Sequence, residues 1–161
     1  MKKISLIVIA LCIVLPVKAL EISCNFEEVY TDGSIQTGKF FSKNGNLRYE
    51  YNAHHLYTIL YNQKKIYLIQ NFNTTTYQHF KDQDNTIYFL SKISSDFPDF
   101  KDKYLFDNFT FLVEKKTSKD FINRIGVISK NLNLSIYFNS CSSEPISDDI
   151  FIHKPFVISH L

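Results

Sequence analysis

The chain has 161 residues, with 18 lysine and arginine side chains, 16 aspartate and glutamate side chains and three cysteines. Hydrophobic residues make up 45% and charged residues 21%, which excludes a disordered chain and, at this length, predicts one domain. Because Lys2, Lys3 and Lys18 lie in the first nineteen residues, the remainder has 15 basic and 16 acidic side chains, which argues against a nucleic-acid or anionic-membrane partner.

Residues 1–19 have the pattern of a secretory signal peptide that is removed on export. Lys2 and Lys3 form the charged start, a predominantly apolar run follows from 4 to 15, and Pro16 precedes a small-residue site at 17–19. Twelve residues span about 18 Å as a helix, which is too short for a hydrocarbon core of about 30 Å. We therefore expect an exported domain of residues 20–161, with a retained membrane anchor as the alternative.

Export places Cys24 and Cys141 in an oxidising compartment, whereas Cys12 lies within the predicted signal peptide. Two cysteines allow one intramolecular pairing, so only its existence is open, and two free thiols are the alternative. A Cys24–Cys141 disulfide would close a loop of more than a hundred residues. In the chain-entropy model such a bond is worth up to about 4–5 kcal/mol.

Strand patterns dominate the first half of the exported domain. Asn44 and Gly45 form a hairpin-turn dipeptide, because both residues tolerate a positive φ. After this turn, residues 46–51 alternate between polar and apolar side chains with the period of a strand. Further strands are predicted at 56–61 and 65–72, around a polar turn at 62–64, followed by an edge-like segment from 73 to about 80.

A short amphipathic helix is predicted next, because Phe97, Phe100, Tyr104 and Leu105 have helical spacing after Ser95-Asp96 and beside Pro98. Residues 87–93 fit a strand or a helix equally. Strands are predicted again at 109–113, 122–128 and 132–138, with a last apolar piece at 150–156. The expected fold is mainly β (α+β): an incomplete antiparallel β-barrel or strongly curved sheet with a short helical lid.

A search for chemistry finds no catalytic, nucleotide-binding or metal-binding motif, so we predict no enzyme, no metal and no cofactor. His54 and His55 are adjacent, and adjacent strand residues face opposite ways, so they are poor joint metal ligands. The sequence has instead many large apolar and aromatic side chains. They indicate either an ordinary core or a cavity between a curled sheet and a helical cover that holds an apolar ligand.

The segment from Gly38 to Tyr51 resembles the LolA family of periplasmic lipoprotein carrier proteins. Segments 26–33, 62–69 and 132–151 are also similar to the family's first strand and turn, its central hairpin, and its last strand with a proline turn and closing Asp-x-x-Phe motif. The matching positions in the first of these segments are Gly38, Phe40, Phe41, Lys43, Gly45, Leu47, Arg48, Tyr49, Glu50 and Tyr51.

This resemblance implies an incomplete barrel whose apolar concave face shields the acyl chains of a lipoprotein during transfer from the inner to the outer membrane. It implies a periplasmic monomer with three partners: acylated lipoprotein cargo, an inner-membrane releasing complex and an outer-membrane acceptor. The alternative is an exported, non-catalytic binding or sensor module of the same fold that holds an apolar ligand or a protein segment. A small secreted enzyme of unrecognised type is a third hypothesis.

The cavity lining is predicted from alternation along the strands, although a register slip of one residue would reverse the face. The family's basic residue, usually arginine and implicated in holding the lid closed, is Lys43 here, so Lys43 is the expected lid contact. The residues expected to line the apolar cavity are Phe40, Leu47, Tyr49, Tyr51, Ile66, Leu68, Phe111 and Leu134.

Overall fold

The computed structural model describes residues 21–81, 86–116 and 121–153. The predicted signal peptide at 1–19 and the end of the last predicted apolar piece, 154–156, lie outside these residues.

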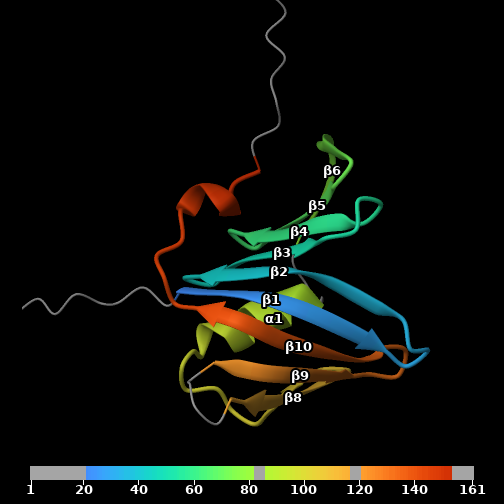
Figure 1. Ribbon diagram of the computed structural model, residues 1–161, viewed down its shortest axis with the longest axis vertical. Helices are drawn as coiled ribbons and strands as arrows, with labels where there is room; N and C mark the ends of the chain where they lie inside the picture. The colour runs from blue at the N-terminus through green and yellow to red at the C-terminus, as the bar shows by residue number, and fades with distance from the viewer. Residues whose placement is uncertain (1–20, 82–85, 117–120, 154–161) are drawn as a thin grey trace, which may run out of the picture.

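Ten strands form one antiparallel sheet with the spatial order β6-β5-β4-β3-β2-β1-β10-β9-β8-β7 (Figure 1). Within the described residues, one α-helix, α1 (Thr86–Ser95), and one short 3₁₀ helix, η1 (Asp148–Phe151), accompany it. The strands are β1 (Glu21–Tyr30), β2 (Ile35–Lys43), β3 (Asn46–Tyr51), β4 (Tyr57–Asn62), β5 (Lys65–Gln70), β6 (Asn73–Lys81), β7 (Lys103–Phe106), β8 (Phe109–Lys115), β9 (Ile122–Ile128) and β10 (Asn133–Ser142).

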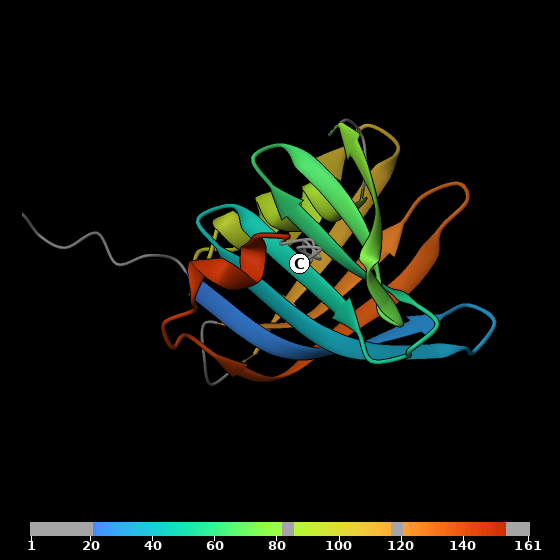
Figure 2. The same cartoon turned by 90° about the horizontal axis from the view of Figure 1, so that it is seen from above.

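The connectivity explains where the helix lies. Strands β1–β6 and β7–β10 are two meanders, and pairing of β1 with β10 joins them into one sheet. Because β6 and β7 are opposite edges, α1, which lies between them in the chain, spans the hollow of the sheet, and Figure 2 shows the sheet curving around it. The predicted mainly β fold with a curved antiparallel sheet and a short helix is confirmed, and the sheet is not closed into a barrel.

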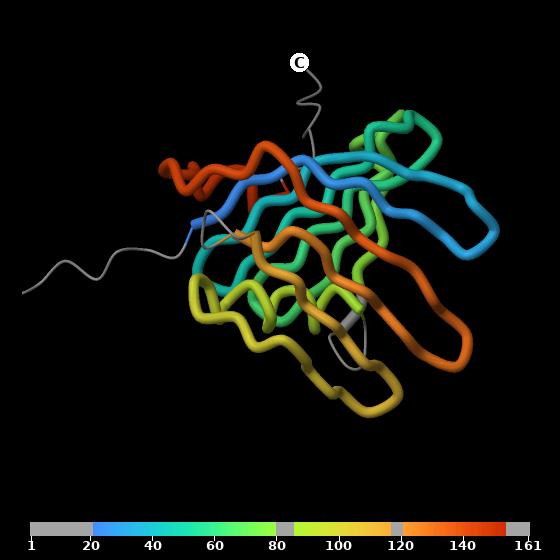
Figure 3. The backbone as a smooth tube through the Cα atoms, turned by 60° about the horizontal axis from the view of Figure 1, so that its bottom comes forward, coloured from blue at the N-terminus to red at the C-terminus, as the bar shows by residue number. Residues whose placement is uncertain are grey.

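Two tight turns follow the local sequence. Asn44 and Gly45 have φ values of 50° and 79° and join β2 to β3 as the predicted two-residue hairpin turn. Gln63 and Lys64, at 49° and 61°, do the same between β4 and β5, inside the polar turn predicted there. These turns lie at one end of the sheet, whereas the β1–β2, β7–β8 and β9–β10 turns project together at the other end (Figure 3).

The helix predicted around 97–105 is wrong. The helix occupies Thr86–Ser95, in the segment whose periodicity was undecided, and Lys103–Phe106 is instead the edge strand β7. Tyr104 and Phe106 are two residues apart, which fits a strand, and Tyr104 pairs with Phe111 of β8. The aromatic side chains of residues 97–106 therefore reach the core from a loop and a strand, although their spacing in the sequence is also that of a helix.

The main core lies on the concave face, between the sheet and α1. The helix contributes four buried apolar side chains, and Phe89 stacks on Phe106 with ring centroids 4.4 Å apart. A second, smaller core lies on the convex face, where Ile146 and Phe151 of the C-terminal segment pack on Leu60 and Ile69. The buried residues of α1 in the main core are Ile87, Phe89, Leu90 and Ile93.

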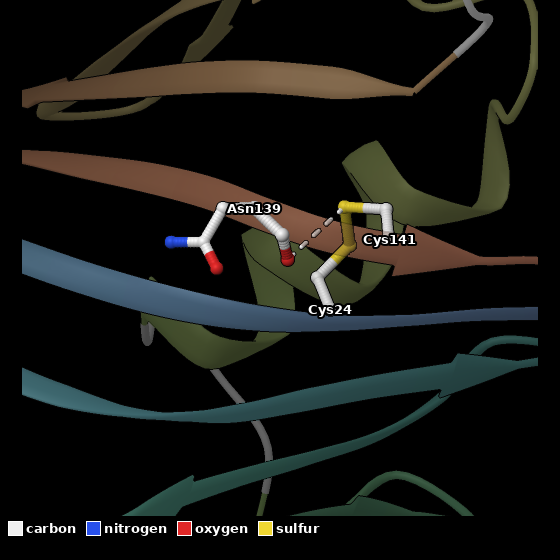
Figure 4. The surroundings of a disulfide bond; sticks show 3 residues. All are labelled: Cys24, Asn139 and Cys141. Atoms are coloured by element: carbon white, nitrogen blue, oxygen red, sulfur yellow. Dashed lines mark hydrogen bonds between the residues drawn. A yellow bond between two sulfur atoms is a disulfide. The ribbon is translucent and has the colours of Figure 1, made fainter.

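A disulfide bond joins Cys24 of β1 to Cys141 of β10, as predicted, across 117 residues of sequence (Figure 4). The two strands are neighbours, and their register shifts between Ser23 and Asn25, so the bond lies at a bulge. The Cys141 Sγ atom also lies 3.9 Å from the backbone oxygen of Asn139. Because a disulfide sulfur has no proton, this is a van der Waals contact.

Candidate apolar binding site

Two adjoining pockets open on the concave face at the end of the sheet that carries the β1–β2 and β3–β4 turns. We call them the outer pocket, of about 410 Å³, and the inner pocket, of about 200 Å³. Tyr30, Tyr51 and Ile59 line both. The outer pocket is completed by Ser34, Gln36, Leu56, Tyr57 and Leu68, and the inner one by Glu28, Thr86, Ile87, Leu90, Leu132, Leu134 and Ile136.

All eight residues predicted to line a cavity belong to the hydrophobic core on the concave face or pack against it. Three of them border the pockets: Leu68 the outer, Leu134 the inner, and Tyr51 both. The others are at most 3% exposed and border neither pocket, because the space above them is filled from α1. These core residues are Phe40, Leu47, Tyr49, Ile66 and Phe111.

The helix is attached at its C-terminal end and borders the inner pocket at its N-terminal end. Ser94 and the buried Ser42 of β2 share a hydrogen bond of 2.8 Å between their hydroxyl oxygens. The Ser91 hydroxyl donates to the backbone oxygen of Gly45 at 2.5 Å. These two bonds tie α1 to the β2–β3 hairpin, whereas Thr86, its first residue, lines the inner pocket.

One buried carboxylate lies at the floor of the inner pocket. Glu28 of β1 is only 5% exposed, and three tyrosine hydroxyls donate hydrogen bonds to its two oxygens. Tyr49 donates to Oε1 at 2.7 Å and Tyr30 to Oε2 at 2.7 Å. Tyr51 reaches both oxygens, at 3.2 and 3.0 Å. With three donors aimed at it, the carboxyl group is held as an acceptor, which is the role of its ionised form.

The same arrangement keeps the phenols protonated. Burial, and then the hydrogen bond to Glu28, raise the pKa of Tyr30 to about 12. Burial together with the negative charge of Glu28 also raises the pKa values of Tyr49 and Tyr51 well above their usual range. Each phenol therefore remains a donor to the carboxylate at every physiological pH.

Sequence reasoning missed Glu28, although the signal was present. Inward positions of β1 alternate, and Cys24 and Phe26 place the next inward side chain at Glu28 and the one after at Tyr30. Tyr49 and Tyr51 have hydroxyl groups, which can donate hydrogen bonds to a buried carboxylate. The cluster could be recognised from two features of the sequence. An acidic residue occupies an inward position of one strand, and tyrosines occupy inward positions of another strand that is expected to lie nearby.

Lys43 does not contact α1, so its predicted role at the lid is corrected. Its ammonium donates to the backbone oxygen of Ile146 at 2.6 Å and lies 2.9 Å from Asp148 and 3.3 Å from Glu21. Side chains alternate along β2, and Ser42 faces the helix, so Lys43 faces the convex side. It holds the C-terminal segment that precedes η1.

The chain matches no protein-family model, and no curated protein matches it in sequence. In the ranges that the structure describes, no helix combines the length and hydrophobicity that crossing a membrane requires. Within the same ranges, no three histidine, cysteine, aspartate or glutamate side chains are grouped so that they could hold a metal ion.

Proposed function

We propose that the protein is a non-catalytic binding protein that shields an apolar chain on its concave face, and that it carries the acyl chains of lipoproteins between the inner and outer membranes. The observation that carries this proposal is the outer pocket, of about 410 Å³, lined by Leu56, Ile59 and Leu68 at the open end of the apolar face. This volume is within the range of pockets that bind small organic ligands.

The physical need for such a pocket is simple. Each acyl methylene exposed to water costs about 0.8 kcal/mol, so an acylated anchor crossing an aqueous compartment requires cover. Burial is the whole task, and it requires no nucleophile or general base. The curved sheet and its helix provide an apolar scaffold for this purpose, with a large aromatic core between them.

The outer pocket accepts one chain, and a larger cargo requires α1 to move. Lifting α1 exposes four buried apolar side chains, at roughly 1.5–3 kcal/mol each, or roughly 6–12 kcal/mol in total. Roughly 8–15 acyl methylenes offset this cost when they take the place of the helix. One long acyl chain therefore balances the displacement of α1, and further chains bind with a net gain.

The size of the outer pocket also supports a second candidate. An exported module that holds a single apolar ligand or protein segment, without delivering it, needs no larger space than the pocket of about 410 Å³. The two functions differ in one respect. A carrier takes cargo from one membrane and gives it to another, whereas a sensor or storage module only binds.

The test measures binding and transfer separately. A fluorescent diacyl lipopeptide should bind the purified oxidised protein, and Leu68→Glu at the outer pocket should weaken binding at least ten-fold. The matched control is Leu105→Glu on β7, because Leu105 is 68% exposed and borders neither pocket. Its affinity should equal that of the wild type, and circular dichroism should show both variants folded.

Transfer of the same lipopeptide between two populations of phosphatidylcholine vesicles separates the candidates. Acceleration by the wild type and not by Leu68→Glu supports the carrier. Binding without acceleration supports the module that only holds its ligand. Failure of the wild type to bind any acylated probe, with Leu68→Glu indistinguishable from it, overturns both.

A further inference from the structure

Glu28 is a buried negative charge that has no cationic partner among the residues that the structure describes. The ion pairs in the described part of the molecule use Lys43, Arg48 and Arg124, and none of them involves Glu28. Three tyrosine hydroxyls satisfy its hydrogen bonds but contribute no net positive charge. A buried carboxylate without a counter-charge is destabilising, so its presence at an inward strand position points to a role beyond packing.

The N-terminal end of α1 does not neutralise the charge of Glu28. Thr86, at the start of α1, lines the same inner pocket as Glu28. A helix N-terminus carries the equivalent of about half a positive charge, so the carboxylate remains in part uncompensated. The inner pocket, of about 200 Å³, lies directly beside it.

The two pockets together have a polar end and an apolar end. The inner pocket presents the carboxylate between Tyr30 and Tyr51, and these two rings also line the outer pocket. The outer pocket continues over Ile59 and Leu68 to the open end of the sheet. Carboxylates pair with ammonium groups, and tyrosine rings attract cations through their faces, so this order of groups matches an amphiphile with a cationic head.

We propose that the paired pockets bind an amphiphile with a primary ammonium head. The ammonium pairs with the Glu28 carboxylate and contacts the rings of Tyr30 and Tyr51, and the hydrocarbon chain lies along Ile59 and Leu68. This inference rests on the proposed function and adds the headgroup to it. The ammonium supplies the counter-charge that Glu28 lacks among the described residues. Ligands with a neutral or anionic head on the same chain bind less well, because they leave Glu28 unpaired or face it with like charge.

The test compares three ligands of equal chain length, each below its critical micelle concentration, on the purified oxidised protein by isothermal titration calorimetry. Dodecylammonium should bind at least ten-fold more tightly than dodecanol, and dodecanoate should bind more weakly than dodecanol. Equal affinities for the ammonium and the alcohol would overturn the headgroup inference and leave the proposed function intact. Binding of none of the three ligands would overturn the proposed function itself.

Two matched variants locate the effect. Glu28→Gln removes the charge and should abolish the preference for dodecylammonium over dodecanol. Glu27→Gln removes the same charge from the adjacent residue, whose side chain faces the opposite side of the sheet, and should keep the full preference. A preference that survives Glu28→Gln, or is lost in Glu27→Gln, contradicts the site. If Glu28→Gln does not fold, the ligand series on the wild type still decides the inference.

The ammonium group can come from a lipid headgroup or from the free N-terminus of a lipopeptide, and two further titrations distinguish them. A diacyl lipopeptide with a free N-terminus is compared with its N-acetylated form. Phosphatidylethanolamine is compared with phosphatidylglycerol, both with short chains. A ten-fold loss on acetylation identifies the peptide terminus, and a ten-fold preference for phosphatidylethanolamine identifies the lipid. No preference in either pair contradicts the inference.

Discussion

Gly38, in the centre of β2, is the position where one added methyl group should do the most damage to the floor of the binding face. It pairs with Phe26 of β1 and Tyr51 of β3. The ring of Phe26 lies against the space where a Cβ atom would be, and the backbone oxygen of Glu50 closes that space from the other strand. Phe26 in turn stacks on Tyr49 with ring centroids 3.9 Å apart.

The loss of stability expected for Gly38→Ala can be estimated from the atoms that block the added methyl group. Overpacking a core costs about 1–3 kcal/mol, and the upper end applies here because one obstacle is a backbone oxygen. Displacing the ring of Phe26 also removes an aromatic pair worth about 0.5–1.5 kcal/mol. The reduced entropy of the unfolded chain returns about 0.4–1 kcal/mol. We therefore expect Gly38→Ala to lower the free energy of unfolding by about 3 kcal/mol, which corresponds to about 10 °C in Tm.

Gly126 in β9 provides the matched control. A Cβ atom there would lie 3.6 Å from Arg124 and 3.8 Å from Leu112, which are ordinary van der Waals contacts. Gly126→Ala should therefore leave stability unchanged or raise it by up to about 1 kcal/mol. Urea unfolding of the oxidised protein, followed by circular dichroism, measures both. If the two variants differ by less than about 1 kcal/mol, the packing argument at Gly38 is refuted.

Three other expectations concern the rest of the molecule. The pKa of Tyr30 and that of Tyr104 are raised to about 12, from 10.0, chiefly by burial, so the folded protein keeps protons that the unfolded chain releases. The stability that these two groups contribute is therefore fully present below pH 10 and falls as the pH rises towards 12. Urea unfolding at each pH, together with tyrosinate absorbance, should show this fall. The fall should be weaker in Tyr30→Phe. Replacing both Cys24 and Cys141 by serine should cost about 4 kcal/mol, because the bond closes a 117-residue separation; an unchanged urea midpoint would contradict this. Lys43→Met should increase hydrogen exchange at 146–151 and leave α1 protected; the opposite pattern would restore a role at the helix.

The strands and their inward faces were predictable because they depend on local properties. Alternation along β3 placed Leu47, Tyr49 and Tyr51 on one face, and the structure places all three on the concave side. The Asn44-Gly45 turn followed from the tolerance of both residues for positive φ. These signals act between neighbours in sequence, so no knowledge of the distant chain was required.

The helix was not predictable in the same way. Residues 87–93 have a periodicity that fits both structures, and the aromatic residues at 97, 100 and 104 have helical spacing without forming a helix. The separation of the two sheet edges decides which of the two segments forms the helix. The chain must pass from β6 to β7 across the hollow, and the apolar segment 86–95 is the one that lies there.

Composition, alternation and turn residues therefore predicted from the sequence a mainly β domain with an apolar inward face and a Cys24–Cys141 pair. The folded arrangement was needed to place Glu28 among three tyrosines, to give Lys43 to the C-terminal segment and to fill most of the hollow with α1. The physical reason is sequence separation. Glu28 meets Tyr49 across 21 residues and Lys43 meets Ile146 across 103, and contacts of that range arise from strand pairing over the whole sheet.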